Sequence, residues 1–186
     1  MSLSLHYDLS ESALRKNIFG PIVGKLKNEQ KPPVAAIIDD ETFSNDAHCK
    51  NISEVKAVID RLPANDEAKV QAKAVYDILA VAESEVHGCP VEETHFHEVG
   101  NITTVKGIVG IAMSFVLANL EHVSATPVQV GSGKVKCAHG VLDIPAPATA
   151  AILKKYNIPV QEQRLEGELC TPTSAALIAY YVKEFD

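Results

Sequence analysis

One short segment of the chain holds an unusual concentration of side chains that bind metals. The segment from His87 to Gly100 contains three of the seven histidines, three glutamates and a cysteine. Imidazole, thiolate and carboxylate groups suit zinc, nickel, copper and iron. A second segment, Lys136 to Gly140, repeats the combination with Cys137 and His139 about forty residues later. Two separate stretches of chain could therefore converge on one metal ion.

The chemistry open to His95 and His97 depends on the backbone between them. In an extended strand, alternate side chains share a face, so both imidazoles could bind one ion while Phe96 faces the core. In a helix the two rings would diverge. A proline-containing turn before them and a glycine after them favour a short extended piece, which we expect. Glu98 can then complete the metal shell or accept an imidazole N–H. The alternative is one histidine at a helix end and the other in a polar groove.

Cys137 and His139 likewise share a face if the chain is extended there. Thiolate with imidazole is a soft combination that favours late first-row metals over magnesium. The alternative for Cys137 is structural, because cysteine is among the most commonly buried residues. His87 is expected at the end of a long helix, where it can meet the last carbonyl groups.

Two further segments could bind an anion. Backbone N–H groups of Gly131-Ser132-Gly133 could hold a phosphate, with Lys134 and Lys136 nearby. The alternative is a plain turn between strands.

The segment from Glu166 to Thr173 sets two carboxylates and two hydroxyls beside an expected helix N-terminus, a position suited to an anion. There, Glu168 and Thr171 are the candidates, and the alternative is that Thr171 only caps the helix that begins with Pro172.

Composition limits the class of protein. The chain has 186 residues and a formal net charge of −7, with a pI near 5.5. This argues against nucleic acid or an anionic membrane as the main partner. The N-terminus does not resemble a signal peptide, and the longest uncharged run, 107–120, is too short to span a bilayer. We expect a soluble cytoplasmic protein whose four cysteines are free thiols or metal ligands.

The periodicity of apolar residues predicts helices over most of the chain after residue 50. Helices are expected over 51–63, 66–86, 103–119, 145–156 and from Thr171 onward, and short strands over 123–130, 134–136 and 158–161. Asn51 with Glu54 predicts the first helix start. Before residue 50 we expect a helix within 9–27 that Gly20-Pro21 breaks, a strand over 34–38 and a polar loop over 39–50.

These elements predict a single compact domain of the α/β or α+β class, rich in helix, with a small mixed sheet. The polar loop is the best candidate boundary. We therefore divide the chain into a divergent N-terminal segment, 1–46, with the loop at its end, and a main part, 47–186.

The motifs and their order resemble the N-terminal part of the LarC family. The motifs are His87-Gly88, Glu92-Glu93, His95-Phe96-His97-Glu98-Val99-Gly100, Gly131-Ser132-Gly133, Cys137-Ala138-His139-Gly140, Pro145-Ala146-Pro147-Ala148-Thr149-Ala150 and Gly167-Glu168-Leu169-Cys170-Thr171-Pro172-Thr173. The resemblance covers about 47–186. LarC-type proteins insert nickel into pyridinium-3,5-bisthiocarboxylic acid mononucleotide, the precursor of the nickel-pincer cofactor.

The resemblance implies a cytoplasmic protein that binds nickel and delivers it into this anionic mononucleotide in a lyase-like, cyclometallase-type reaction. CTP, with magnesium or manganese, would take part only if a separate C-terminal domain or partner chain is supplied. By position, the metal ligands would be His95, His97, Cys137 and His139, and the catalytic residues Glu98, Glu168 and Thr171. The phosphate would lie near Gly131, Ser132, Gly133, Lys134 and Lys136.

Several positions depart from the family pattern. Thr103, Thr104 and Gly107 stand in a region where the family has two aspartates and a serine, and Ser174 replaces a glycine. The loop before Cys49 keeps one histidine, His48, where family members carry a histidine-rich tract. The hypotheses are thus a nickel insertion component, a non-catalytic metal-binding or regulatory paralog, and a zinc hydrolase with Glu98 as general base. Any of them could form a homo-oligomer.

Overall fold

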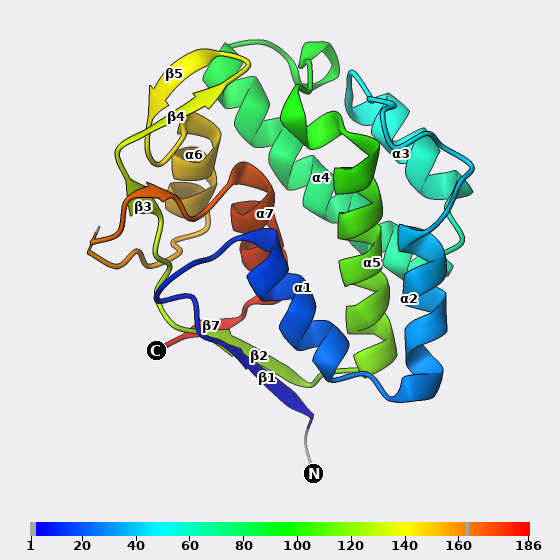
Figure 1. The fold of residues 1–186 in the computed structure, drawn as a ribbon. Helices are drawn as coiled ribbons and strands as arrows, with labels where there is room; N and C mark the ends of the chain where they lie inside the picture. Colours follow the sequence, from blue (N-terminus) through cyan, green and yellow to red (C-terminus); the bar gives the residue numbers. More distant parts are fainter. Residues whose placement is uncertain (1–2, 163) are drawn as a thin grey trace.

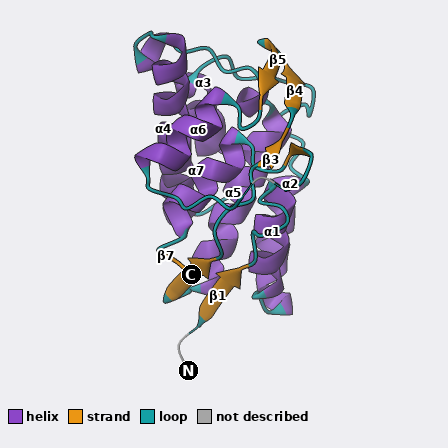
Figure 2. Cartoon of the chain, turned by 90° about the vertical axis from the view of Figure 1, so that its left-hand side faces the viewer, coloured by secondary structure: helices purple, strands orange, loops and turns teal. Residues whose placement is uncertain are grey.

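Helices make up most of the structure, and a small sheet lies at one end of them (Figures 1 and 2). The computed structural model describes residues 3–162 and 164–186. The helices are α1 (Arg15–Gly24), α2 (Lys31–Ile38), α3 (Ile52–Arg61), α4 (Asp66–His87), α5 (Ile102–Ala118), α6 (Pro147–Lys155) and α7 (Pro172–Tyr181), with short 3-10 turns η1 (Asn28–Gln30), η2 (Val91–Glu93) and η3 (Glu98–Gly100). The strands are β1 (Ser4–Tyr7), β2 (His122–Ala125), β3 (Gly131–Ser132), β4 (Lys134–Cys137), β5 (Gly140–Asp143), β6 (Gly167–Glu168) and β7 (Glu184–Phe185). The mixed, helix-rich class expected from the sequence is confirmed.

The centre of the core is the contact between α4 and α5. Helix α5 is apolar on nearly every side, and it packs against α1, α2, α3 and α4. Helix α4 presents Ala68, Ala72, Val75, Tyr76 and Leu79 to the interior, and its other helix neighbours are α3, α6 and α7. An apolar helix is stable in water only when its faces are covered, and α1, α2, α3 and α4 cover α5. Among residues 3–162 and 164–186, no helix has both the length and the apolar character required to span a bilayer.

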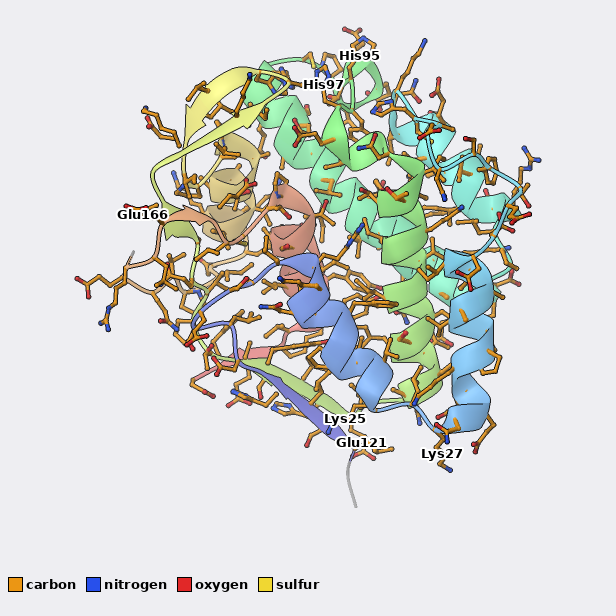
Figure 3. All side chains as sticks on the ribbon, viewed as in Figure 1. Lys25, Lys27, His95, His97, Glu121 and Glu166 are labelled. Carbon is orange, nitrogen blue, oxygen red and sulfur yellow. The ribbon has the colours of Figure 1, made fainter. Side chains whose placement is uncertain are left out.

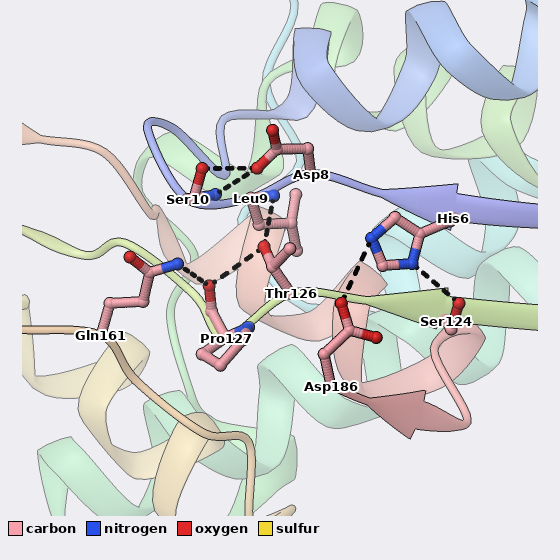
Figure 4. Close-up of polar contacts among 9 residues, drawn as sticks. All are labelled: His6, Asp8, Leu9, Ser10, Ser124, Thr126, Pro127, Gln161 and Asp186. Atoms are coloured by element: carbon pink, nitrogen blue, oxygen red, sulfur yellow. Dashed lines mark hydrogen bonds and ion pairs between the residues drawn. The ribbon is translucent and has the colours of Figure 1, made fainter.

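The main sheet has three parallel strands in the order β1, β2, β7. Beyond the strand ends, side chains continue the connection, as Figure 4 shows: the Thr126 hydroxyl accepts a hydrogen bond from Leu9 N at 2.8 Å, and the Gln161 amide donates to Pro127 O at 2.9 Å. On the exposed face, His6 contacts Ser124 and Asp186. The first strand is thereby tied to segments more than a hundred residues away.

Two predictions before residue 50 are wrong. Helix α1 continues through Gly20-Pro21, with Pro21 inside it. Burial of Ile18 and Ile22 on one face outweighs the single backbone hydrogen bond that the proline cannot make. The segment 34–38 belongs to α2 and is not a strand. The two prolines of α2, at positions 32 and 33, lie in the first helical turn, where a backbone N–H has no partner within the helix. Segment 39–50 is a loop, as predicted.

Later in the chain the helix predictions are confirmed and the strand predictions are partly wrong. Asn51 caps α3 by accepting from Glu54 N, and Thr171 caps α7. Strand β2 ends at Ala125, because the chain then turns away to pair with other segments, and 158–161 makes only an isolated bridge at Val160. The predicted division at residues 46 and 47 stays a prediction; residues from β1, α1 and α2 share one core cluster with the rest.

A matched pair of glycines tests the small sheet formed by β3 and β6. Gly131 has a φ of +84° and a Cβ there would overlap the Gly167 carbonyl oxygen, whereas Gly133 has a φ of +93° with open space around it. We expect Gly133→Ala to cost about 1–2 kcal/mol from the left-handed backbone alone. Gly131→Ala should cost clearly more in denaturant unfolding, because two backbones must separate. Equal costs would contradict the close β3–β6 approach.

Candidate functional site

A cavity of about 760 Å³ lies where several helix ends meet. Its walls come from the N-terminal ends of α1, α5, α6 and α7, the C-terminal end of α4, and the β4–β5 hairpin. These elements come together at one end of the helical body, away from the parallel sheet (Figure 1). A volume of several hundred Å³ is typical of pockets that bind small molecules and cofactors.

Three histidines meet at this cavity. The ring centroids are 4.7 Å apart for His97 and His139, 4.9 Å for His87 and His139, and 6.5 Å for His87 and His97. They come from the turn of the β4–β5 hairpin, the end of α4 and the segment before η3. The structure thus brings His97 and His139 together from two stretches of chain. His139 lies in a turn, so the extended backbone that would place Cys137 and His139 on one face does not continue to it.

We expected His87 only at the end of a long helix, near its last carbonyl groups, but His87 also lines the cavity. Helix α4 continues to His87 and ends there because Gly88 adopts the left-handed conformation at φ 64°. One turn earlier, Glu83 Oε2 lies 3.5 Å from His87 Nε2 and also faces the cavity. The spacing of four residues at the end of a long helix was the signal that could have identified this pair.

The position of His97 is fixed by the residues around it. Phe96 is buried, as predicted, and its ring lies 6.1 Å from that of Tyr76. The fully buried Tyr76 donates its hydroxyl to Val99 O at 2.8 Å. Burial raises the pKa of Tyr76 well above its usual value, so this hydroxyl stays protonated and keeps donating. The histidine segment is therefore anchored to α4 on both sides of His97.

The carboxylates at this end of the cavity influence one another and the histidines. Burial raises the pKa of Glu83; His87 and His97 oppose the rise, and Glu98 adds to it. Burial, and then Glu98, raise the pKa of Glu168. Burial lowers the pKa of His97, and the neighbouring His139 lowers it further. A neutral imidazole is the form that binds metals.

His95 takes a different position from the other histidines. Its side chain is exposed, and it is absent from the described residues that line the cavity. Figure 3 shows His95 and His97 at the same end of the molecule. The segment 94–96 has no strand partner, although Phe96 N donates to Lys50 O at 2.7 Å. Whether His95 binds a metal stays a prediction.

The candidate phosphate loop is part of the small sheets. Gly131 and Ser132 pair with β6, and the Ser132 hydroxyl donates to Leu165 O at 3.0 Å. Lys134 Nζ lies 2.6 Å from Asp143 Oδ1 on the exposed hairpin. Of residues 131–136, the cavity wall as described includes only Val135. Phosphate binding by Gly131 to Lys136 stays a prediction.

Four of the other predicted side chains do line the cavity: Glu98, Cys137, Glu168 and Thr171. Thr171 also caps α7, because its hydroxyl accepts from Ser174 N at 3.2 Å. The Ser174 hydroxyl, fully buried, lies 3.0 Å from that of Thr171. The serine that departs from the family pattern therefore packs into the cap itself.

The other departures surround an arginine that the sequence did not single out. Arg15 Nη1 lies 3.4 Å from both Thr103 O and Thr104 O. A Cβ on Gly107 would come within 2.7 Å of the same nitrogen. The absence of a side chain at Gly107 thus leaves room for the guanidinium, which lines the cavity.

A buried lysine holds the polar loop next to this site. Lys106 is 3% exposed, and its Nζ donates to Asp40 O and to Asn45 Oδ1, the latter at 2.9 Å. At the end of the loop, the His48 ring contacts His97 O, and Cys49 N donates to Gly100 O at 2.8 Å. The loop with its single histidine is therefore attached to the backbone of the histidine segment.

The geometry defines a class of protein: a mixed α/β protein with a ligand-sized cavity whose wall carries imidazole, thiol and carboxylate groups. Over the part of the chain that the structure describes, no set of three or more His, Cys, Asp or Glu side chains forms a ready-made metal site. The potential ligands instead surround a common space.

Comparison with known proteins identifies the family. A family model described as nickel insertion protein matches residues 7–186, so the chain belongs to the nickel insertion protein family. The match begins well before residue 47, where the motif resemblance starts. No solved structure matches the chain.

Curated relatives carry the corresponding name. The pyridinium-3,5-bisthiocarboxylic acid mononucleotide nickel insertion proteins of Desulfitobacterium hafniense and Clostridium acetobutylicum are each 40% identical to the chain, over 136 and 134 residues, or 73% and 72% of it. That of Geobacillus kaustophilus is 37% identical over 142 residues, or 76%. These matches cover 33%, 31% and 34% of the three relatives. The chain spans about a third of the length of the relatives.

Thiol reactivity tests the arrangement of the four free cysteines. Cys170 is fully buried, which raises its pKa to about 12, and burial also raises the pKa of Cys49. Cys89 and Cys137 are partly exposed. The thiolate is the reactive form of cysteine. Iodoacetamide at pH 8 should therefore label Cys89 and Cys137 at least about tenfold faster than Cys170 and Cys49, because each unit by which a pKa lies further above the pH lowers the thiolate fraction about tenfold. Peptide mass mapping measures this, with urea-unfolded protein as the control; rapid native labelling of Cys170 would contradict the structure.

Proposed function

We propose that the chain is a nickel insertion component, which binds nickel at the histidine end of the cavity and delivers it to a sulfur-bearing pyridinium mononucleotide in the same cavity. The observation that carries the proposal is the meeting of His87, His97 and His139 beside Cys137 in a ligand-sized space. The names of the curated relatives support the metal and the nucleotide.

The chemistry of the donor set fits this proposal. Imidazole and thiolate bind late first-row metals, and a substrate with thiocarboxylate sulfur competes for the same ions. Ligands that surround a space without enclosing it can pass a metal to a second ligand that enters that space. Glu98 and Glu168 are proposed as the acid–base groups, since metal binding to a protonated ligand releases a proton.

The complete reaction requires more than this chain in our proposal. The chain spans about a third of the relatives' length, and we propose that CTP, with magnesium or manganese, acts through a separate C-terminal domain or partner chain. The reaction would take place in the cytoplasm. Glu98, Glu168 and Thr171 would then act on the nucleotide at the cavity, next to the metal.

Nickel titration of untagged protein tests the metal end. His97→Ala and His139→Ala should each weaken nickel binding at least about 10-fold, since loss of even a residue that only supports a metal ligand costs about 10- to 100-fold. His122→Ala is the matched control, since His122 is half-exposed on the distant sheet and pairs with Glu184. Calorimetry measures the affinities, and His95→Ala and His87→Ala show which of the two joins the ligand set.

Two outcomes would count against the metal proposal. Equal nickel affinity in wild type, His97→Ala and His139→Ala would show that nickel does not bind at the histidines of the cavity. Strong preference for zinc over nickel, with hydrolytic activity lost in Glu98→Gln, would instead support a zinc hydrolase.

A reconstituted insertion assay tests the delivery step. The chain, nickel, the bisthiocarboxylate mononucleotide, CTP with magnesium or manganese, and a candidate C-terminal partner should together yield a nickel-containing nucleotide, detected by mass spectrometry. Glu168→Gln should slow formation at least tenfold if a positioned acid–base group contributes about 10²–10⁴-fold. Glu162→Gln, on an exposed residue paired with Arg164, is the control. Nickel binding without any metallated product would favour the non-catalytic paralog.

A further inference from the structure

We propose that Arg15 and the helix ends around it form an anion subsite in the cavity wall that holds the phosphate of the mononucleotide. The existence of an anion subsite follows from the residues themselves, and its assignment to a mononucleotide phosphate rests on the proposed function. The subsite would fix the direction in which the ligand enters the cavity.

The first argument is the incomplete pairing of Arg15. Its guanidinium is partly buried in the cavity wall and meets the two carbonyl oxygens of Thr103 and Thr104 at 3.4 Å. In the described part of the chain, no carboxylate forms an ion pair with it. A guanidinium has five N–H donors and stays charged in proteins. Most of these donors therefore remain available to a ligand in the cavity.

The second argument is the direction of the surrounding helices. The residues that cap α1, α5, α6 and α7 all line the cavity: Leu14, Asn101, Ala146 and Thr171. Each of these helices has at least nine residues. The caps of α1, α5 and α6 make no side-chain hydrogen bond to the helix. Their N-terminal dipoles add to the charge of Arg15, and Lys16 also lines the wall.

The third argument is that the cavity wall carries both kinds of charge. Glu83, Glu98 and Glu168 line it together with His87, His97 and His139, and Arg15 and Lys16 are the basic side chains of the wall as described. The cavity therefore offers carboxylate, imidazole and guanidinium groups to one ligand.

These groups match the two ends of the proposed ligand. The sulfur-bearing ring carries soft groups that suit a metal held by imidazole and thiolate, whereas phosphate is a hard anion that Arg binds by bidentate hydrogen bonds. The lysines at 134 and 136 are a weaker candidate, because Lys134 is already paired with Asp143 and neither lines the cavity as described.

A pair of ligands isolates the phosphate contribution. Metal-free protein is titrated by calorimetry with nicotinic acid mononucleotide and with nicotinic acid riboside, which lacks the phosphate. Wild type should bind the mononucleotide at least tenfold more tightly. Arg15→Gln should reduce this preference about 10- to 100-fold, the range expected for a hydrogen bond to a charged group. Arg15→Lys keeps the charge but not the paired N–H donors of the guanidinium, so it should lose less of the preference for the mononucleotide.

Matched variants provide the controls. Lys25→Gln removes a charge from the opposite end of α1, as Figure 3 shows, and should leave the preference unchanged. Lys134→Gln tests the alternative phosphate position. Circular dichroism and thermal unfolding confirm that each variant is folded. If Arg15→Gln fails to fold, the result for Arg15→Lys decides, because a loss of preference with the charge retained would come from the missing bidentate hydrogen bonds of the guanidinium.

The outcomes separate this inference from the proposed function. A phosphate preference that is absent in wild type, unchanged in both Arg15 variants, or lost only in Lys134→Gln would overturn the subsite. Nickel titration of the same proteins tests the histidines separately: Arg15→Gln should bind nickel as wild type does. If the preference for the mononucleotide depends on Arg15 but nickel affinity is unchanged in His97→Ala and His139→Ala, the subsite is supported and the nickel proposal fails.

Discussion

The hydrogen bond from Tyr76 to Val99 O is the interaction on which the position of the site depends. Tyr76 is fully buried between α4 and α5, and a buried hydroxyl without a partner would cost about 1–3 kcal/mol. The carbonyl of Val99 is therefore held at one place relative to α4. Because the same helix ends at His87, this bond fixes the histidine segment against the helix that supplies the third imidazole.

Local patterns were sufficient where one segment determines its own structure. The cap at Asn51 and the apolar spacing of α4 are properties of adjacent residues, so both could be predicted. Pro21 shows the limit: its local tendency to end a helix is outweighed by burial against elements far along the chain. The short strands were difficult for the same reason, since two-residue pairings such as β3 with β6 depend on a distant partner.

The candidate site was predictable in its residue types but not in its membership. His97, Cys137 and His139 stand out by type and spacing, and all three line the cavity. His87 lines the cavity as described and His95 does not, because Gly88 ends α4 where His87 can reach the hairpin turn. Arg15 belongs to none of the motifs recognised in the sequence, so its place at the cavity could not be predicted from them. It becomes part of the wall only because α1 packs against the glycine at position 107.

The polar loop connects the core to the histidine segment at the cavity. Burying the ammonium of Lys106 is costly unless its donors are satisfied, and here the loop supplies the oxygens at Asp40 and Asn45. The same loop ends with His48 against the carbonyl of His97. Any change in the backbone at His97 must therefore be accommodated by the loop, and the loop is held from α5. The residues that would bind a metal and the helix that forms the core are joined by one continuous set of polar contacts.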